Sequence, residues 1–199
     1  MVDGIAELSG TAISVQADVS SSAEVHRMIA SVIEDLGRID YVTHNAGEGR
    51  IADLERLDEE MFDQTLRINL LSDFLVSQAA IPHMKERGGR LIFMSSGPAR
   101  TGGKISAAYA ASKPGLEGLM HYYAMSLLPH RITANAIAPS MIESDMVRKM
   151  QFPPFKAMPL GRLVLLCYKC GAPQKGQRLC YQEPQGIQPI YVLSLTRLL

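Results

Sequence analysis

Short apolar runs alternate with longer amphipathic stretches along most of the chain. Residues 12–17 form a β-rich run, and the serines that follow introduce a helical pattern. Ser21 and Glu24 have the spacing of a capping box, and the next apolar residues recur three and four positions apart until Gly37. This pattern predicts a strand over 12–17, followed by an amphipathic helix that covers a sheet.

The same alternation of strand and helix continues beyond Gly37. The run 39–43 is apolar enough to predict a strand buried on both faces, as in parallel sheets. The elements predicted after it are a helical region over 58–86, a strand over 90–94, a helix over 107–127 and a strand over 132–138. Strand and helix units of this length predict a parallel α/β sheet with right-handed crossovers.

The regular pattern ends near Phe152, where a pair of prolines follows. After Arg162 the sequence has no clean period of either kind. We therefore divide the chain into an α/β domain over 1–162 and a divergent tail over 163–199.

All three cysteines, Cys167, Cys170 and Cys180, fall in this tail. The spacing Cys167-x-x-Cys170 is compatible with half of a zinc site or with a redox pair. No histidine follows His130 and no second cysteine pair exists, so a zinc site lacks ligands. A redox pair should also open a helix after a strand, which this context does not offer. We expect free thiols and no metal site.

The composition argues against several classes of partner. The 199 residues include 20 Lys and Arg and 20 Asp and Glu, so the balanced charge gives no basic surface for nucleic acid. No apolar run approaches the roughly twenty residues of a membrane helix, and the first residues do not resemble a secretion signal. We expect a soluble, cytoplasmic protein that binds neither nucleic acid nor membrane.

Two side chains suited to proton chemistry lie four residues apart in the predicted helix 107–127. At this spacing Tyr109 and Lys113 point to the same helix face. A nearby ammonium group stabilises a phenolate, so we expect Lys113 to lower the pKa of Tyr109 toward the range useful in catalysis. Tyr and Lys at this spacing are also common on solvated surfaces, so the pair alone supports a site only weakly.

Other polar residues extend this pair into a candidate site. Ser96 follows one predicted strand, Asn45-Ala46-Gly47 follows another, and Asn69 falls in the helical region between them. Strand ends of this kind form the carboxyl edge of the sheet, where open α/β sheets bind ligands. Each residue also has a structural alternative, since Ser96 could form an ordinary turn, Asn45 could brace neighbouring strands and Asn69 could cap a kink.

With these residues in this order, the chain resembles the short-chain dehydrogenase/reductase family over about residues 8–162. The motifs that carry the resemblance are Ala17-Asp18-Val19, Gly37-Arg38-Ile39-Asp40, Asn45-Ala46-Gly47, Asn69, Ser95-Ser96, Tyr109 with Lys113, and Asn135-Ala136-Ile137-Ala138-Pro139. The resemblance implies a Rossmann-like, doubly wound parallel sheet. We expect this sheet to be incomplete, without the family's first two strands and its last strand.

The resemblance also implies a role for each candidate residue. Tyr109 is the general acid or base, Ser96 holds the substrate oxygen, Lys113 binds the nicotinamide ribose, and Asn69 holds a water of the proton relay. Asp18 and Val19 are expected to line the adenine. Further cofactor contacts are expected from Asn45, Ala46 and Gly47 after one strand and from Pro139, Ile142 and Ser144 after another.

The activity that the resemblance implies is hydride transfer between NAD or NADP and a carbon that bears oxygen, with Tyr109 supplying or removing the proton. The implied substrates are ketones and secondary alcohols of the 3-oxoacyl or small sugar and alcohol type. The alternative is a catalytically silent remnant that only self-associates. In the family the helical regions 58–86 and 107–127 pair subunits, which favours a homodimer. Core or subunit contacts are expected from Leu71, Phe74, Leu75, Leu116, Leu119 and Met120.

One match to a cofactor motif is rejected. Residues 47–52 read G-x-G-x-x-A after a strand, which matches the dinucleotide-binding motif. That motif requires an acidic residue at the end of the next strand, about twenty residues later. The acidic residue at that distance, Asp73, falls inside a predicted helix instead. The family's phosphate-binding glycines belong on its first strand and helix, whereas residues 2–8 fit its second helix. We therefore expect weak NAD(P)H binding, and unpaired backbone groups along the inner edge of the strand 39–43.

Overall fold

The computed structural model describes residues 10–97, 105–139 and 192–195. Its helices are α2 (Ser22–Leu36), α3 (Glu59–Leu66), α4 (Ser72–Met84) and α5 (Ala107–Ser126), with a π-helical segment η1 (Arg67–Leu71) and a 3-10 turn η3 (Leu128–His130). The strands are β1 (Tyr41–His44), β2 (Gly89–Met94), β3 (Ile132–Ile137) and β4 (Val192–Leu195). The predictions for residues 2–8 and for the three cysteines lie outside the described residues.

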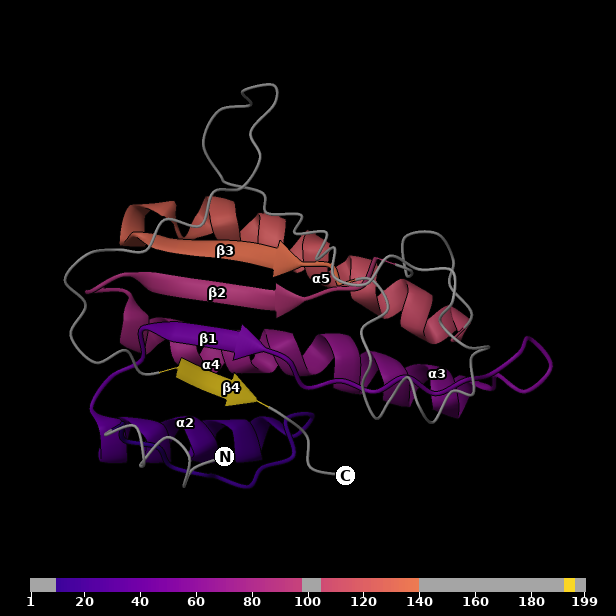
Figure 1. Cartoon of the computed structure of the whole chain (residues 1–199), viewed down its shortest axis with the longest axis horizontal. Coiled ribbons are helices and arrows are strands. Elements are labelled where there is room, and N and C mark those ends of the chain that lie inside the picture. Colours follow the sequence, from indigo (N-terminus) through magenta and orange to yellow (C-terminus); the bar gives the residue numbers. More distant parts are fainter. Residues whose placement is uncertain (1–9, 98–104, 140–191, 196–199) are drawn as a thin grey trace.

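The four strands form one parallel sheet in the order β3-β2-β1-β4. Tyr41 pairs with Arg90 and Gly89 pairs with Ile132, so the strands run in register toward a common carboxyl edge. Figure 1 shows the four arrows pointing the same way, with α4 and α5 behind the sheet. The predicted parallel α/β architecture is therefore confirmed.

Local signals at both ends explain the first described helix. The Ser21 hydroxyl accepts a hydrogen bond from the Glu24 backbone N–H at 3.5 Å, and Gly37 ends the helix with a φ of 77°. The Glu24 carboxylate accepts from the Asp18 backbone N–H at 2.8 Å instead of from Ser21. Only one half of the predicted capping box is therefore present.

Burial alternates along the strands. In β1, Val42 and His44 are buried, whereas Tyr41 and Thr43 are half-buried. The prediction of a strand buried on both faces is wrong here, because the described helices α4 and α5 cover one face of the sheet (Figure 1). The core therefore lies between that face and the helices.

Two predictions about the sheet are also wrong. Residues 12–17 form no strand, because no described strand lies beside them to pair with; Ile13, Val15 and Ala17 pack against the core instead. The inner edge of the sheet is not unpaired, since β4 from the tail runs parallel to β1 with Tyr41 opposite Val192. This pairing satisfies backbone groups that an open edge would expose.

The helical region 58–86 is interrupted near its middle. The Asp58 carboxylate caps α3 by accepting from the Met61 backbone N–H at 2.8 Å, as expected for a helix that begins there. The segment η1 then follows as a π-helix that contains Asn69. A π-helical turn accommodates an extra residue and is frequent at functional sites.

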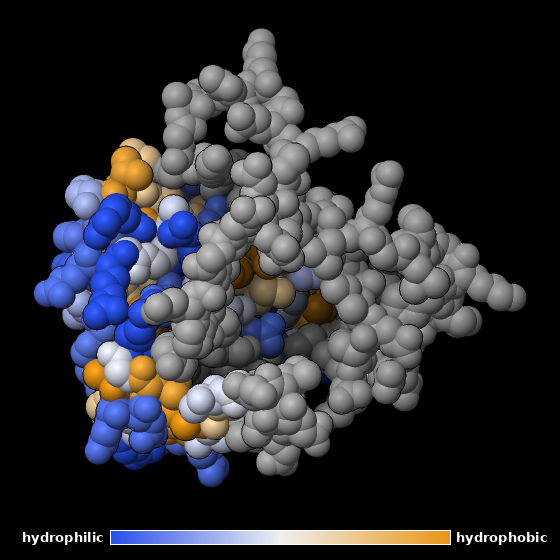
Figure 2. All heavy atoms as spheres, turned by 60° about the vertical axis from the view of Figure 1, so that its left-hand side comes forward, coloured by the Kyte–Doolittle hydropathy of each residue, from blue (hydrophilic) through white to orange (hydrophobic). Residues whose placement is uncertain are grey.

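The surface at the end of the sheet where the strands begin is largely polar. Figure 2, turned so that the end where the strands begin comes forward, shows mainly hydrophilic side chains among the coloured atoms. Exposed charged residues at that end include Lys85, Glu86, Arg87 and Arg90.

No helix among the described residues is long and apolar enough to cross a membrane.

Candidate active site

The candidate residues come together at the carboxyl edge because the β2–β3 pairing continues past the strands. The Ser95 backbone N–H donates to the Ile137 carbonyl at 2.8 Å, and the Gly97 N–H donates to the Pro139 carbonyl at 2.9 Å. Ser96 lies between these two bonds. Its position at the edge is therefore set by backbone hydrogen bonds on either side.

Helix α5 brings the phenol and the ammonium group to this edge. The Ser106 hydroxyl caps the helix by accepting from the Tyr109 backbone N–H at 3.3 Å. The Tyr109 side chain shares a hydrogen bond with Ser96, and the Lys113 Nζ lies 5.9 Å from the centre of the Tyr109 ring. The structure thus brings Tyr109, Lys113 and Ser96 into one cluster.

The environment of Tyr109 differs from the sequence prediction. Burial raises the pKa of Tyr109, and the hydrogen bond with Ser96 counteracts only part of this effect. The predicted lowering by Lys113 is therefore wrong, because removal from water disfavours the phenolate more than its neighbours stabilise it. The phenol keeps its proton at neutral pH.

Lys113 is held by contacts that its spacing from Tyr109 does not reveal. Its Nζ donates to the Met94 carbonyl at 2.9 Å, and only 7% of the residue is exposed. Burial lowers the pKa of Lys113, and the carboxyl group of Asp73 opposes this effect. The hydrogen bond to the Met94 carbonyl therefore holds the ammonium group at the end of β2.

Asn69 ties the loop after β1 to helix α5. Its Oδ1 accepts from the Glu48 N–H at 2.8 Å, while its Nδ2 donates to the Glu48 carbonyl at 2.9 Å and to the Ser112 hydroxyl at 3.3 Å. The Ser112 hydroxyl donates in turn to the Tyr109 carbonyl at 3.0 Å. The Asn69 side chain thus positions the backbone around Tyr109, and a water-holding role stays a prediction.

The segment 45–47 passes close to this cluster. Asn45 is exposed and, within the described part of the chain, makes no side-chain hydrogen bond; the bracing alternative therefore has no support there. A Cβ atom added at Gly47 would lie 3.2 Å from the Asn69 Oδ1 and 3.3 Å from the Lys113 Nζ. Glycine here lets the backbone approach both polar groups, and the neighbouring Ala46 is buried.

The other predicted cofactor contacts have mixed environments. The Asp18 carboxylate accepts from the Ser20 N–H at 2.9 Å, and Val19 belongs to the core. Pro139 lies beside Gly97, as described above, whereas Ile142 and Ser144 lie outside the described residues. Cofactor binding by these residues stays a prediction. In the described ranges no cluster of three or more His, Cys, Asp or Glu could hold a metal.

Sequence reasoning missed two buried polar residues beside the cluster. Asp73 is 3% exposed and His44 is 1% exposed. Burial raises the pKa of Asp73 to about 7, although the Lys113 cation and a hydrogen bond from Ser72 oppose this. Burial lowers the pKa of His44 to about 3, so its ring is neutral. The signal that could have found Asp73 is its position four residues after Asn69, on the same helix face.

Comparison with known proteins identifies the family of the chain. The family model described as "short chain dehydrogenase" matches residues 1–152. The chain belongs to this family. A dehydrogenase/reductase structure from Sinorhizobium meliloti has 30% sequence identity and a TM-score of 0.70, covering 73% of this chain and 57% of that one. The predicted family and its Rossmann-like fold are therefore confirmed.

Curated members of the short-chain dehydrogenase family give the same picture. Hydroxynaphthalene reductase-like protein Arp2 of Metarhizium acridum is 35% identical over 147 residues, covering 73% of this chain and 55% of the relative. The 3-oxoacyl-[acyl-carrier-protein] reductase FabG of Thermotoga maritima is 35% identical over 153 residues, covering 73% and 61%. The chain thus spans somewhat more than half the length of these relatives.

Proposed function

We propose that the protein is an NAD(P)-dependent oxidoreductase that transfers a hydride between a nicotinamide cofactor and a ketone or secondary alcohol. The observation that carries the proposal is the cluster in which Tyr109 shares a hydrogen bond with Ser96 while the Lys113 Nζ lies 5.9 Å from the phenol ring. Membership of the short-chain dehydrogenase family supports it.

The residues at the carboxyl edge fit such a cofactor. The backbone at Gly47 runs between two polar side chains with no Cβ to block an approach. The Lys113 ammonium group has three donors, of which one is used on the Met94 carbonyl, so the others are available to sugar hydroxyls. When bound, the cofactor supplies or accepts the hydride. Lys113 and Gly47 would hold it.

The protein's own side chains handle the oxygen and the proton. Ser96 donates to the substrate oxygen and orients it toward Tyr109. The Tyr109 hydroxyl then gives its proton to that oxygen as negative charge develops there. Because burial raises the pKa of Tyr109, the phenol keeps its proton at neutral pH and can act as the acid when a ketone is reduced.

The names of the relatives and the hydroxyl groups of Ser96 and Tyr109 support a proposal for the substrate class. Names of matched proteins include hydroxynaphthalene reductase-like protein and 3-oxoacyl-[acyl-carrier-protein] reductase. Both names describe reductases. We propose that the substrate is a ketone or the corresponding secondary alcohol, either a 3-oxoacyl compound or a small sugar or alcohol.

The test is the absorbance of NADPH and NADH with a panel of ketones that includes 3-oxoacyl thioesters. Tyr109→Phe should reduce turnover by about 100-fold or more, because it removes only the transferred proton. Tyr122→Phe is the matched control, since Tyr122 is 66% exposed on the same helix. Turnover that survives Tyr109→Phe contradicts the proposal. A folded chain without turnover favours the silent, self-associating remnant.

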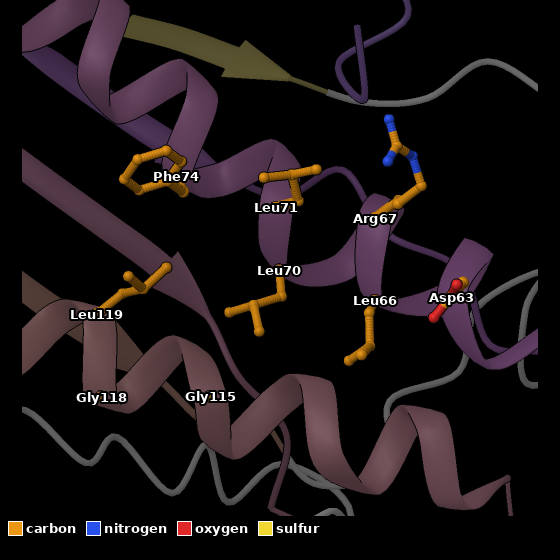
Figure 3. Close-up of a pocket in the computed structure, with 9 residues that line it drawn as sticks. All are labelled: Asp63, Leu66, Arg67, Leu70, Leu71, Phe74, Gly115, Gly118 and Leu119. Atoms are coloured by element: carbon orange, nitrogen blue, oxygen red, sulfur yellow. The ribbon is translucent and has the colours of Figure 1, made fainter. Parts of the chain in front are cut away.

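We also propose that the protein forms a homodimer through the helices of 58–86 and 107–127. A groove of about 520 Å³ runs between α3, η1 and α4 on one side and α5 on the other. Figure 3 shows Leu66 and Leu70 facing α5 across it, with Asp63 and Arg67 at one end. The apolar lining and the opposite charges suit a second copy related by a twofold axis. The groove contains none of the candidate catalytic residues.

Gly118 provides a test of the dimer, because a Cβ there would meet nothing within 4 Å. Gly118→Arg should leave the monomer intact and block a partner in the groove. Sedimentation velocity should show a dimer for the wild type and a monomer for this variant. Ala30→Arg, at an exposed position on α2, is the control. A monomeric wild type, or a Gly118→Arg dimer, would refute this interface.

A further inference from the structure

The helical region that carries Asn69 changes its hydrogen-bond pattern at this residue. In an α-helix the Ser72 backbone N–H would donate to the Ile68 carbonyl, four residues before it. In η1 this N–H donates to the Arg67 carbonyl instead, five residues before it. The turn that contains Asn69 is therefore wider than an α-helical turn, and the Ile68 carbonyl loses the donor that an α-helix would give it.

The Ser72 side chain takes the place of that donor. Its hydroxyl donates to the Ile68 carbonyl at 2.6 Å, near the short end of the range for such bonds. The same hydroxyl lies 3.2 Å from the Asp73 Oδ1, and its single hydrogen favours the shorter contact. Ser72 and Ile68 are both buried, so water is a poor substitute for this bond.

A serine in an ordinary α-helix can make the same contact with the carbonyl four residues before it. There the contact is an addition, because that carbonyl already accepts from the backbone. Here it replaces the backbone bond, since the Ser72 N–H is used on the Arg67 carbonyl. A buried carbonyl that loses its donor is costly. The Ser72 hydroxyl therefore stabilises the π-helical turn against the α-helical one.

The bond from Ser72 acts directly on the backbone of Asn69. The Ile68 carbonyl belongs to the peptide group that joins Ile68 to Asn69, so the orientation of this group sets the direction of the Asn69 side chain. That side chain is fully buried. Its Oδ1 accepts from the Glu48 N–H, and its Nδ2 donates to the Glu48 carbonyl and to the Ser112 hydroxyl. All three bonds depend on where the π-helical turn places Asn69.

The space around η1 is also tight. A Cβ atom added at Gly47 would lie 3.2 Å from the Asn69 Oδ1, and one added at Gly115 would lie 3.1 Å from the Leu70 Cδ2. The turn is therefore held between the loop after β1 and helix α5. A change in its hydrogen-bond pattern would move Asn69 or Leu70 against these neighbours.

We infer that Ser72 is a positioning residue, whose hydroxyl holds the π-helical turn in the form that directs Asn69 at the backbone around Tyr109. The contacts from Ser72 to Ile68, from Asn69 to Ser112 and from Ser112 to the Tyr109 carbonyl are all 3.3 Å or shorter. The inference rests on the proposed function, because the position of Asn69 affects turnover only if Tyr109 is the acid.

Hydrogen exchange at the Asn69 side chain tests the inference without turnover. The chain contains three asparagines, so protein labelled with ¹⁵N-asparagine gives three side-chain NH₂ signals, and Asn69→Ala identifies the one from Asn69. Both hydrogens of the Asn69 Nδ2 are used in buried bonds, so they should exchange slowly, whereas those of the exposed Asn45 should exchange fast. Ser72→Ala should speed exchange at Asn69 by about tenfold or more.

Ser77→Ala is the matched control. It removes the same atom from the same helix, and Ser77 is also buried, but its hydroxyl lies 3.1 Å from the His44 Nε2. This variant should leave exchange at Asn69 nearly unchanged. A rise of equal size in both variants would reflect a general loss of stability and overturns the inference, as does an unchanged rate in Ser72→Ala. Failure of Ser72→Ala to fold, while Ser77→Ala folds, also overturns it, because the whole fold would then need Ser72.

In an active protein Ser72 and Asn69 should act as one unit. Ser72→Ala should lower kcat in the wild type but change it by less than about twofold in Asn69→Ala, where the residue that it positions is absent. Equal fold losses in both backgrounds indicate independent, merely structural effects and overturn the inference. Absence of turnover in the wild type rejects the proposed function alone, and the exchange result still decides whether Ser72 positions Asn69.

Discussion

Replacement of Asp73 by asparagine should change how the stability of the protein depends on pH. Burial raises the pKa of this carboxyl group from its ordinary value of 3.8 to about 7. The folded protein therefore holds this proton more tightly than the unfolded chain does. The stability that this provides is fully present below pH 3.8 and is lost as the pH rises through about 7. Asparagine has no such proton to lose.

The magnitude follows from the size of the pKa change. Each unit of pKa change is worth about 1.4 kcal/mol, so the rise in the pKa of Asp73 on folding corresponds to about 4 kcal/mol of pH-dependent stability. The free energy of unfolding of Asp73→Asn, relative to the wild type, should therefore increase by up to about 4 kcal/mol between pH 4 and pH 8. The variant is expected to gain most above pH 7, where the wild type holds a buried carboxylate.

Urea denaturation at several pH values provides the assay. Far-UV circular dichroism is the suitable signal, because the chain contains no tryptophan. Asp35→Asn makes the same chemical change at an exposed position of α2 and is the matched control. If the difference between Asp73→Asn and the wild type stays constant from pH 4 to pH 8, the argument from burial is wrong.

Three other changes test the local structure. Gly88→Ala should cost about 2 kcal/mol or more, because Gly88 has a φ of 84° and its new Cβ would lie 2.8 Å from the Arg131 carbonyl. Ser21→Ala should cost about 1 kcal/mol through loss of the α2 cap. Urea denaturation measures both, and wild-type midpoints would contradict these assignments. Removal of residues 191–199 should free the β1 edge and increase self-association in sedimentation velocity; unchanged association would show that β4 does not protect this edge.

Most of the elements, and the family, could be predicted from the sequence. The apolar spacing and the end signals located α2 and α5, and the β-rich runs located β1, β2 and β3. These features depend on residues close together in the chain. The order of Asn69, Ser96, Tyr109 and Lys113 identified the candidate site, because parallel strands bring their carboxyl ends to one edge.

Features that depend on partners distant in sequence could not be predicted in this way. Residues 12–17 have strand-like composition yet form no strand, because a strand also needs a neighbour with which to pair. The segment Val192–Leu195 has no clear strand pattern in its sequence. It nevertheless forms β4, because its backbone pairs with the edge of β1. Pairing partners are decided by the whole fold.

The pKa values of the site residues also depend on parts of the chain that are distant in sequence. The sequence placed a cation four residues from Tyr109, and that spacing alone predicted a lower pKa. Packing buries the phenol, which raises the pKa of Tyr109, and also buries Asp73 and His44. Local sequence thus determined which groups are present and on which helix face, whereas folding decided how far each is removed from water, because burial is contributed by every element packed around it.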